Sequence, residues 1–342
     1  MKKYSLVLVF LLAVLSYSYG QKTFDRAEFY ADKNPLVVNL STDIGNLMSG
    51  KIKNQKQEGI FTCTLRDTNA INARVEINLR GNMRRSYCKM PPLKLHFIKD
   101  SASELAPLSS VKLVPSCGFS KDYEQLVLKE YLLYKMYNLL TDKSFKVRLL
   151  LLTYDDSKKK KKPFTQYAFF IEDADQMAKR NKCLVAADNQ KFLTDATDNR
   201  QITLTCLFQY MIGNTDFSVP NNHNIKIIKS KKDTTSKPYA VPYDFDYSGI
   251  VNADYAIPNE SLGLENVTQR MYRGFPRTMS ELNPLLQIFK EQKANIYALI
   301  EDCKPLEEYN KKQMTDYLDD FFKMIDKPSE VKSAFIDNAR RF

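Results

Sequence analysis

The sequence predicts an α+β protein whose first half is rich in strands and whose second half is mainly helical. Between residues 35 and 97, short segments alternate apolar with polar residues, which is typical of strands that bury one face. Residues 122–140 instead place apolar side chains at helical spacing, and most segments after Glu172 do the same. A strand-rich part with one inserted helix, followed by a helical part, suggests two lobes with a cleft between them.

Seven segments of the first half are expected to be strands. Five of them should form a small antiparallel sheet with one buried face: 36–40, 61–65, 74–79, 93–97 and 111–114. Two more, 147–154 and 166–171, flank a run of five lysines at 158–162. This run predicts a solvated hairpin tip, and the alternative is a surface that attracts anions.

Helical periodicity accounts for most of the remaining chain. In 122–140 the apolar residues Leu128, Leu132 and Met136 recur at helical spacing. Gly213 should end a second helix. The predicted helices are 122–140, 173–180, 201–212, 282–300, 307–324 and 330–339, with a short hairpin formed by 224–228 and 239–243. We therefore expect a β-rich lobe over 21–172 and a mainly helical lobe over 173–342.

The first 20 residues have the three parts of a secretory signal. Lys2 and Lys3 provide the positive start, residues 6–15 are apolar, and Ser18-Tyr19-Gly20 is a small-x-small cleavage site. About ten apolar residues are too few to span a bilayer, and no later run approaches the length that would. We expect cleavage after Gly20 and a secreted or periplasmic protein without a transmembrane segment.

Composition excludes several functions. The ten glycines never form GxGxxG or GxxxxGK[ST], which excludes the dinucleotide and Walker-type phosphate loops. Two histidines cannot build a His-rich zinc site. The formal net charge is +11, but the lysine runs lack interleaved aromatic residues and arginines, so we expect no nucleic-acid partner. Six cysteines in an exported chain permit disulfides, and we expect one pair among Cys63, Cys88 and Cys117.

The most informative pattern is a group of acids and amides around one short hairpin. Gly213-Asn-Thr-Asp216 leaves a helix end, Asn221-Asn-His-Asn224 follows on the same loop, and Asp244-Phe-Asp246 follows the hairpin. Phosphoryl transfer needs such a set, because one carboxylate orients the attacking hydroxyl while an amide and a second carboxylate hold Mg²⁺. Hard oxygen ligands suit Mg²⁺ or Mn²⁺. Each of these three segments, taken alone, is also typical of an ordinary turn without a catalytic role.

These residues resemble the CotH-type spore-coat kinases, atypical members of the protein-kinase-like fold. The motifs are Gly213-Asn-Thr-Asp216, His223-Asn224, Asp244-Phe-Asp246 and Arg80-Gly-Asn82, and they are also similar to catalytic segments of HipA-like kinases. The resemblance implies a two-lobed protein-kinase-like fold with a β-rich N-lobe and a helical C-lobe. It further implies a secreted kinase that transfers the γ-phosphate of ATP, with Mg²⁺ or Mn²⁺, to a Ser or Thr hydroxyl of an envelope or secreted protein.

The resemblance assigns four residues to catalysis and metal binding. Asp216 would be the catalytic acid, Asn224 and Asp244 would hold the metal, and Asp246 would be a second candidate ligand. Asn221 follows Asp216 at the five-residue spacing of the protein-kinase loop, so the choice between Asn221 and Asn224 stays open.

Four more residues are assigned to ATP. Lys94 would contact phosphate, Glu130 would pair with that lysine, and Arg80 would serve where other kinases have a glycine-rich loop. Glu172 would lie near the connection between the lobes, where the base binds. Without the resemblance, Lys94 is the solvent face of a strand and Glu130 a helix-surface acid.

Three other functions remain open. The first is a catalytically inactive kinase-fold envelope protein that binds a nucleotide or another ligand. The second is an adhesin that uses the basic hairpins and the 20 tyrosines for contact. The third is a hydrolase with Asp216 and Asp244 as paired carboxylates. The sequence determines neither the acceptor nor the oligomeric state.

Overall fold

The computed structural model describes residues 24–49, 56–65, 70–81, 83–99 and 104–339. The expected signal segment 1–20 and Asn82 of the Arg-Gly-Asn motif lie outside the described residues. Export of the protein therefore stays a prediction.

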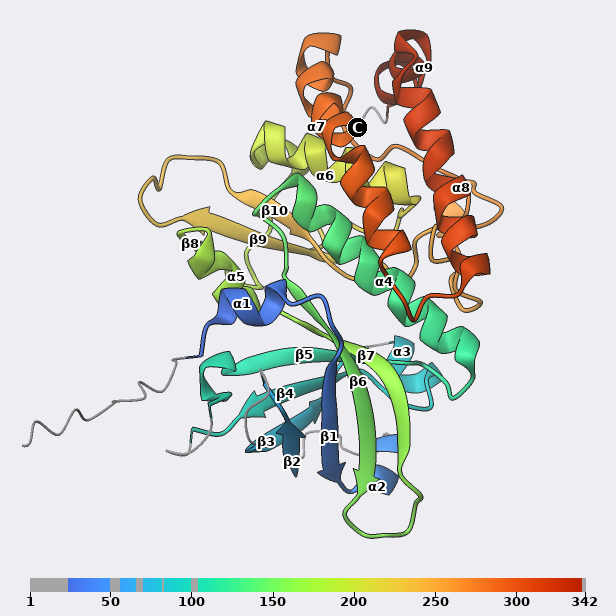
Figure 1. Ribbon diagram of the computed structural model, residues 1–342. Coiled ribbons are helices and arrows are strands. Elements are labelled where there is room, and N and C mark those ends of the chain that lie inside the picture. Colours follow the sequence, from blue (N-terminus) through green and yellow to red (C-terminus); the bar gives the residue numbers. More distant parts are fainter. Residues whose placement is uncertain (1–23, 50–55, 66–69, 82, 100–103, 340–342) are drawn as a thin grey trace, which may run out of the picture.

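Seven strands close into a barrel in the order β1-β2-β3-β4-β5-β7-β6 (Figure 1). They confirm the seven predicted strands, with bounds that differ by a few residues. The strands are β1 (Leu36–Thr42), β2 (Gln57–Cys63), β3 (Ile71–Leu79), β4 (Leu93–Phe97), β5 (Ser110–Pro115), β6 (Val147–Asp156) and β7 (Phe164–Ile171).

One parallel pairing closes the barrel. All other neighbouring strands run antiparallel, but β1 lies parallel to β6, with Leu36 opposite Leu150. Alternate side chains point inward and form an apolar core that includes Leu40, Phe61 and Phe170, each at most 1% exposed. The wall is therefore buried on its inner face all the way round.

The two-lobed protein-kinase-like fold implied by the resemblance is wrong. The strands form a closed mixed barrel and not the expected small antiparallel sheet. The physical reason is that alternation indicates one buried face, which an open sheet and a barrel wall share. Nothing local to β1 or β6 marks them as partners, because their pairing joins distant parts of the chain.

Outside the barrel, the described chain forms helices and a second, three-stranded sheet joined by loops. The helices are α1 (Arg26–Ala31), α2 (Ile44–Met48), α3 (Met83–Tyr87), α4 (Lys121–Leu140), α5 (Ala174–Arg180), α6 (Asn199–Ile212), α7 (Met279–Glu301), α8 (Glu308–Ile325) and α9 (Pro328–Lys332), and the second sheet has the order β10 (Tyr239–Pro242), β9 (Ile225–Ser230), β8 (Cys183–Val185). The predicted hairpin of β9 and β10 is confirmed, and so are the first five of the six predicted helices, with bounds that differ by a few residues. The last predicted helix, 330–339, is instead α9 followed by a π-helical turn, Ser333–Asp337.

Helix α4 lies between the barrel and the other long helices (Figure 1). It packs on β6 and β7 on one side and on α7 on the other. Most of its residues are buried, including the polar Lys129 and Glu130, which a surface helix would expose. This helix therefore carries charged side chains into the interior.

The lysine run 158–162 is exposed at the turn between β6 and β7, as predicted. None of the helices in the described ranges is long and apolar enough to cross a membrane.

Candidate functional site

The loop after α6 begins at Gly213, whose backbone conformation favours glycine. Gly213 ends the helix in the left-handed region, with φ of 68°. A Cβ atom there would collide with the hydroxyl of Tyr317. The next residue, Asn214, is fully buried, and its Oδ1 atom accepts a hydrogen bond from the backbone N–H of Asp216 at 2.9 Å. Packing and this turn together fix the position of Asp216.

Both carboxylate oxygens of Asp216 have partners on the same loop. Oδ1 lies 2.7 Å from Nε2 of His223. Nδ2 of Asn224 donates to Oδ2 at 2.9 Å and to the backbone carbonyl of Asp216 at 2.8 Å. Asn224 is buried whereas Asn221 is exposed. The structure therefore brings Asn224, and not Asn221, to Asp216.

Asp244 is held beside this pair by backbone contacts. The N–H of Tyr243 donates to the carbonyl of Asn224 at 3.0 Å, and the N–H of Asp244 donates to the hydroxyl of Tyr134 on α4 at 2.8 Å. Asn224 and Asp244 both have positive φ, 52° and 67°. Such conformations are costly outside glycine and gather at functional sites. Two of the three residues predicted from sequence as metal ligands thus share an unusual backbone state, and the third, Asp246, does not.

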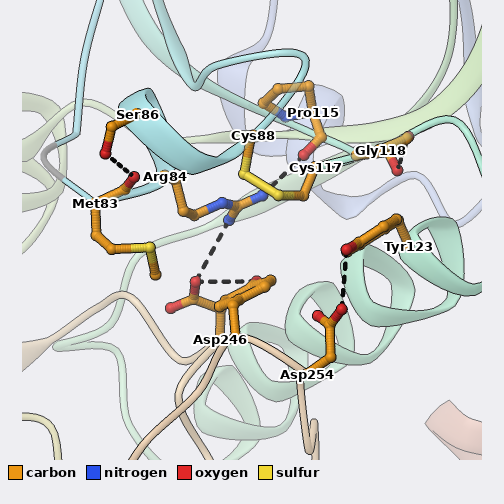
Figure 2. The surroundings of a disulfide bond; sticks show 12 residues. Met83, Arg84, Ser86, Cys88, Pro115, Cys117, Gly118, Tyr123, Asp246 and Asp254 are labelled. Carbon is orange, nitrogen blue, oxygen red and sulfur yellow. Dashed lines mark hydrogen bonds and ion pairs between the residues drawn. A yellow bond between two sulfur atoms is a disulfide. The ribbon is translucent and has the colours of Figure 1, made fainter.

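An arginine from α3 joins two buried acids. Arg84 Nη1 lies 3.8 Å from Oδ2 of Asp246, and Nη2 donates to the carbonyl of Pro115 at 2.9 Å (Figure 2). The same Nη1 atom lies 3.3 Å from Oε2 of Glu130 on α4. Asp246 also accepts a hydrogen bond from the hydroxyl of Tyr255 at 3.2 Å. The Oε1 atom of Glu130 and the Nε atom of Arg84 are buried without a hydrogen-bond partner among the described residues. Buried polar atoms without partners are uncommon and often mark functional sites.

A disulfide fixes the helix that carries this arginine. Cys88, which follows α3, is bonded to Cys117, so the expected pair among Cys63, Cys88 and Cys117 is confirmed (Figure 2). Next to it, the N–H of Lys89 donates to the carbonyl of Cys117 at 2.8 Å. Both links tie α3 to the segment after β5, the strand whose last residue, Pro115, accepts from Arg84.

The buried acids repel one another. Burial, and then the charges of Asp244 and Asp216, raise the pKa of Asp246 to about 7. Burial and the charge of Asp246 also hold the pKa of Glu130 well above its usual range, although Arg84 opposes this. One arginine cannot neutralise all of these carboxylates, so the cluster favours binding a proton or a further cation.

Cationic side chains face the acids from the barrel. Lys112 on β5 lies 4.4 Å from the ring centre of Tyr243, the residue before Asp244. Burial and the neighbouring Arg80 lower the pKa of Lys112 to about 7, while Asp244 opposes the shift. Lys112 was not singled out from the sequence, because it alternates with Val111 and Leu113 as any wall residue does. No signal in the sequence distinguishes it from other lysines of the wall.

The remaining predicted ATP residues lie elsewhere or have other partners. Lys94 is opposite Lys112 in the β4–β5 register, but Glu130 pairs with Arg84 and not with Lys94. Glu172 accepts from Arg180 at 2.9 Å and from the N–H of Lys146 at 3.1 Å, so both contacts are structural. Arg80 follows β3 and acts electrostatically on Lys112 and Glu130.

Asn224 and Asp244 suit a Mg²⁺ ion that takes only part of its coordination shell from the protein. Within the described ranges, no three His, Cys, Asp or Glu side chains are grouped so that they could hold a metal ion. Magnesium in phosphotransfer sites, however, usually takes one or two carboxylates and completes its shell with phosphate and water. The Nδ2 atom of Asn224 faces Asp216, so its Oδ1 atom faces the other way and can serve as a ligand.

Neither a family model nor a curated protein matches this chain. The resemblance to CotH-type kinases therefore depends on its short motifs alone.

Proposed function

We propose that this protein is a phosphotransferase that uses ATP with Mg²⁺ or Mn²⁺ and transfers the γ-phosphoryl group to a Ser or Thr hydroxyl of a protein. The observation that carries the proposal is the contact between Asp216 and Asn224, with Asp244 held next to them. An acid, an amide and a second acid in this arrangement are what positioning and charge neutralisation in phosphoryl transfer require.

Each residue has a role that follows from its surroundings. Asp216, whose carboxylate is held by His223 and Asn224, would accept the proton of the attacking hydroxyl. Asn224 and Asp244 would hold the divalent ion, which supplies charge neutralisation at the phosphates when bound. Lys112, which lies against the ring of Tyr243, and Arg80, whose charge acts on both Lys112 and Tyr243, would face the phosphates. We expect the acceptor to be an exported protein, because residues 1–20 of this chain are expected to be a secretory signal.

Thermal unfolding with ATP, with and without Mg²⁺ or Mn²⁺, tests nucleotide binding. Ligand at a hundredfold over its Kd stabilises by about 2.7 kcal/mol, which raises Tm by roughly 5 °C in a chain of this size. Asp244→Asn should abolish the metal-dependent shift. Asp326→Asn is the control, because Asp326 is exposed at the end of α8 and pairs with Lys290, which has no part in the proposed reaction. No shift in any condition would contradict the proposal.

Transfer itself is tested with ATP labelled at the γ-phosphate. Asp216→Asn should retain the Tm shift and lose transfer to protein by about a hundredfold or more, the usual contribution of a general base. A metal-dependent Tm shift in the wild-type protein without any transfer would instead favour the nucleotide-binding module considered above.

A further inference from the structure

A cleft lies between α4, α8 and the segment that follows Asp246. Its volume is about 490 Å³, and its lining includes Lys129, Gly249, Asn252, Thr268, Gln313 and Tyr317. This volume is within the range of small-molecule sites, about 300–1,000 Å³. Lys129 and Glu130 are consecutive on α4, so their side chains leave the helix roughly 100° apart. The cleft is therefore separate from the acidic loop, although α4 serves both.

Lys129 is a buried cation with neutral partners. It is 4% exposed, and its Nζ atom lies 3.3 Å from Oε1 of Gln313 and 3.5 Å from the carbonyl of Val251. Burial lowers its pKa to about 8. A buried ammonium group normally has an anionic partner, because neutral acceptors only partly offset the loss of hydration. The lysine at the bottom of this cleft therefore favours an anionic group of a ligand.

The rim of the cleft has the opposite character. Asp316, Asp319 and Asp320 of α8 line it, together with Lys323. Asp316 pairs with Lys312 and Asp319 accepts from Tyr297, while Asp320 is exposed. With Lys312 and Lys323 beside them, the three carboxylates leave the rim a net charge of −1, which disfavours a ligand with two negative charges and favours one whose outer end is positive.

We infer that this cleft binds a short peptide of two or three residues with free ends. The peptide carboxylate would lie on Lys129 and its ammonium group at the aspartates of α8. Its amides could bond to the Asn252 side chain, to the second N–H of the Gln313 amide, whose first donates to Tyr309, and to the Thr268 hydroxyl oxygen as an acceptor, since that hydroxyl already donates to Asn266. The cleft has more room than a single amino acid needs. This inference does not depend on the proposed phosphotransfer, because none of the residues assigned to that reaction lines the cleft.

Titration calorimetry with trialanine tests the inference without any variant. The full chain should bind trialanine saturably. Trialanine amide, which lacks the carboxylate, and N-acetyltrialanine, which lacks the ammonium group, should each bind at least tenfold more weakly, the effect of one lost charge-assisted hydrogen bond. Absence of binding at millimolar trialanine, or equal affinities for the free and blocked peptides, would overturn the inference.

Substitution of the lysine locates the binding. Lys129→Met should weaken trialanine binding at least tenfold and should remove the difference between trialanine and its amide. Lys135→Met, at another position of α4, is the matched control and should bind as the wild-type protein does. Undiminished binding to Lys129→Met would show that the peptide binds elsewhere and would overturn the assignment. Should Lys129→Met not fold, Asp320→Asn gives the same test at the exposed rim, where the discrimination against N-acetyltrialanine should fall.

Discussion

Two arginine–glutamate ion pairs of equal length lie in different regions of the molecule. On the barrel wall, Arg74 of β3 lies 3.3 Å from Glu58 of β2, and the side chains are 54% and 72% exposed. Between the barrel and α4, Arg84 lies 3.3 Å from Glu130, and the side chains are 10% and 2% exposed. Distance alone therefore says little about what a pair contributes. Water screens the first pair, whereas the second has lost its hydration and each charge depends on the other.

The largest expected effect is the removal of the buried arginine. Arg84→Met leaves Glu130 and Asp246 buried without their cation, and a lost partner in a buried pair costs about 3–5 kcal/mol. Urea denaturation of the variant should show this loss in the free energy of unfolding. Arg74→Met is the matched control and should change it by less than about 1 kcal/mol. Equal losses in both variants would mean that burial does not distinguish the two pairs.

The disulfide provides the second test, because it fixes α3 and with it Arg84. Cys88 and Cys117 are 29 residues apart, and closing a loop of this order stabilises by roughly 3–4 kcal/mol in the chain-entropy account. The double variant Cys88→Ala/Cys117→Ala should lose about this much in urea denaturation. Reductant should destabilise the wild-type protein and leave the double variant unchanged. A wild-type protein that is equally stable with and without reductant would contradict the prediction.

The third test concerns Lys112, a buried charge of the site that has no carboxylate in an ion pair with it among the described residues. Its pKa is lowered to about 7 by burial and by Arg80, so between pH 7 and the usual value near 10.5 the unfolded chain binds more protons than the folded one. Stability should therefore rise with pH in this range. Between pH 7 and 8.5 the wild-type protein should gain about 1–2 kcal/mol relative to Lys112→Met. Lys94→Met, at the opposite position of β4, is the control, and an identical pH profile of wild type and Lys112→Met would refute the prediction.

The elements of the fold that depend on neighbours in sequence could be predicted. Gly213 ends α6 because its left-handed conformation is local, and apolar alternation located the barrel strands. The closure of the barrel could not be predicted, because the parallel pairing of β1 with β6 is decided by the packing of the whole wall. Alternation is compatible with either an open sheet or a barrel.

The same division applies to the site. The contact of Asp216 with Asn224 lies within one loop, and the sequence singled out both residues. The partner of Glu130 was missed because it depends on where α3 lies, which the Cys88–Cys117 bond and Pro115 determine. Lys94 was the expected partner, yet a strand pattern gives every outward lysine the same appearance.

The smallest expected effect concerns the exposed pair itself. A double-mutant cycle with Arg74→Met and Glu58→Gln should give a coupling energy of about 0.2–1 kcal/mol, falling further when salt shortens the screening length. The pair holds two long side chains in one geometry, and that entropy cost offsets most of its Coulomb attraction. A coupling above 2 kcal/mol that persists at 1 M salt would show that the wall shields this pair from water. The exposed fraction of the side chains would then not explain why this pair differs in energy from the pair of Arg84 and Glu130. The position of each pair in the fold would have to explain the difference.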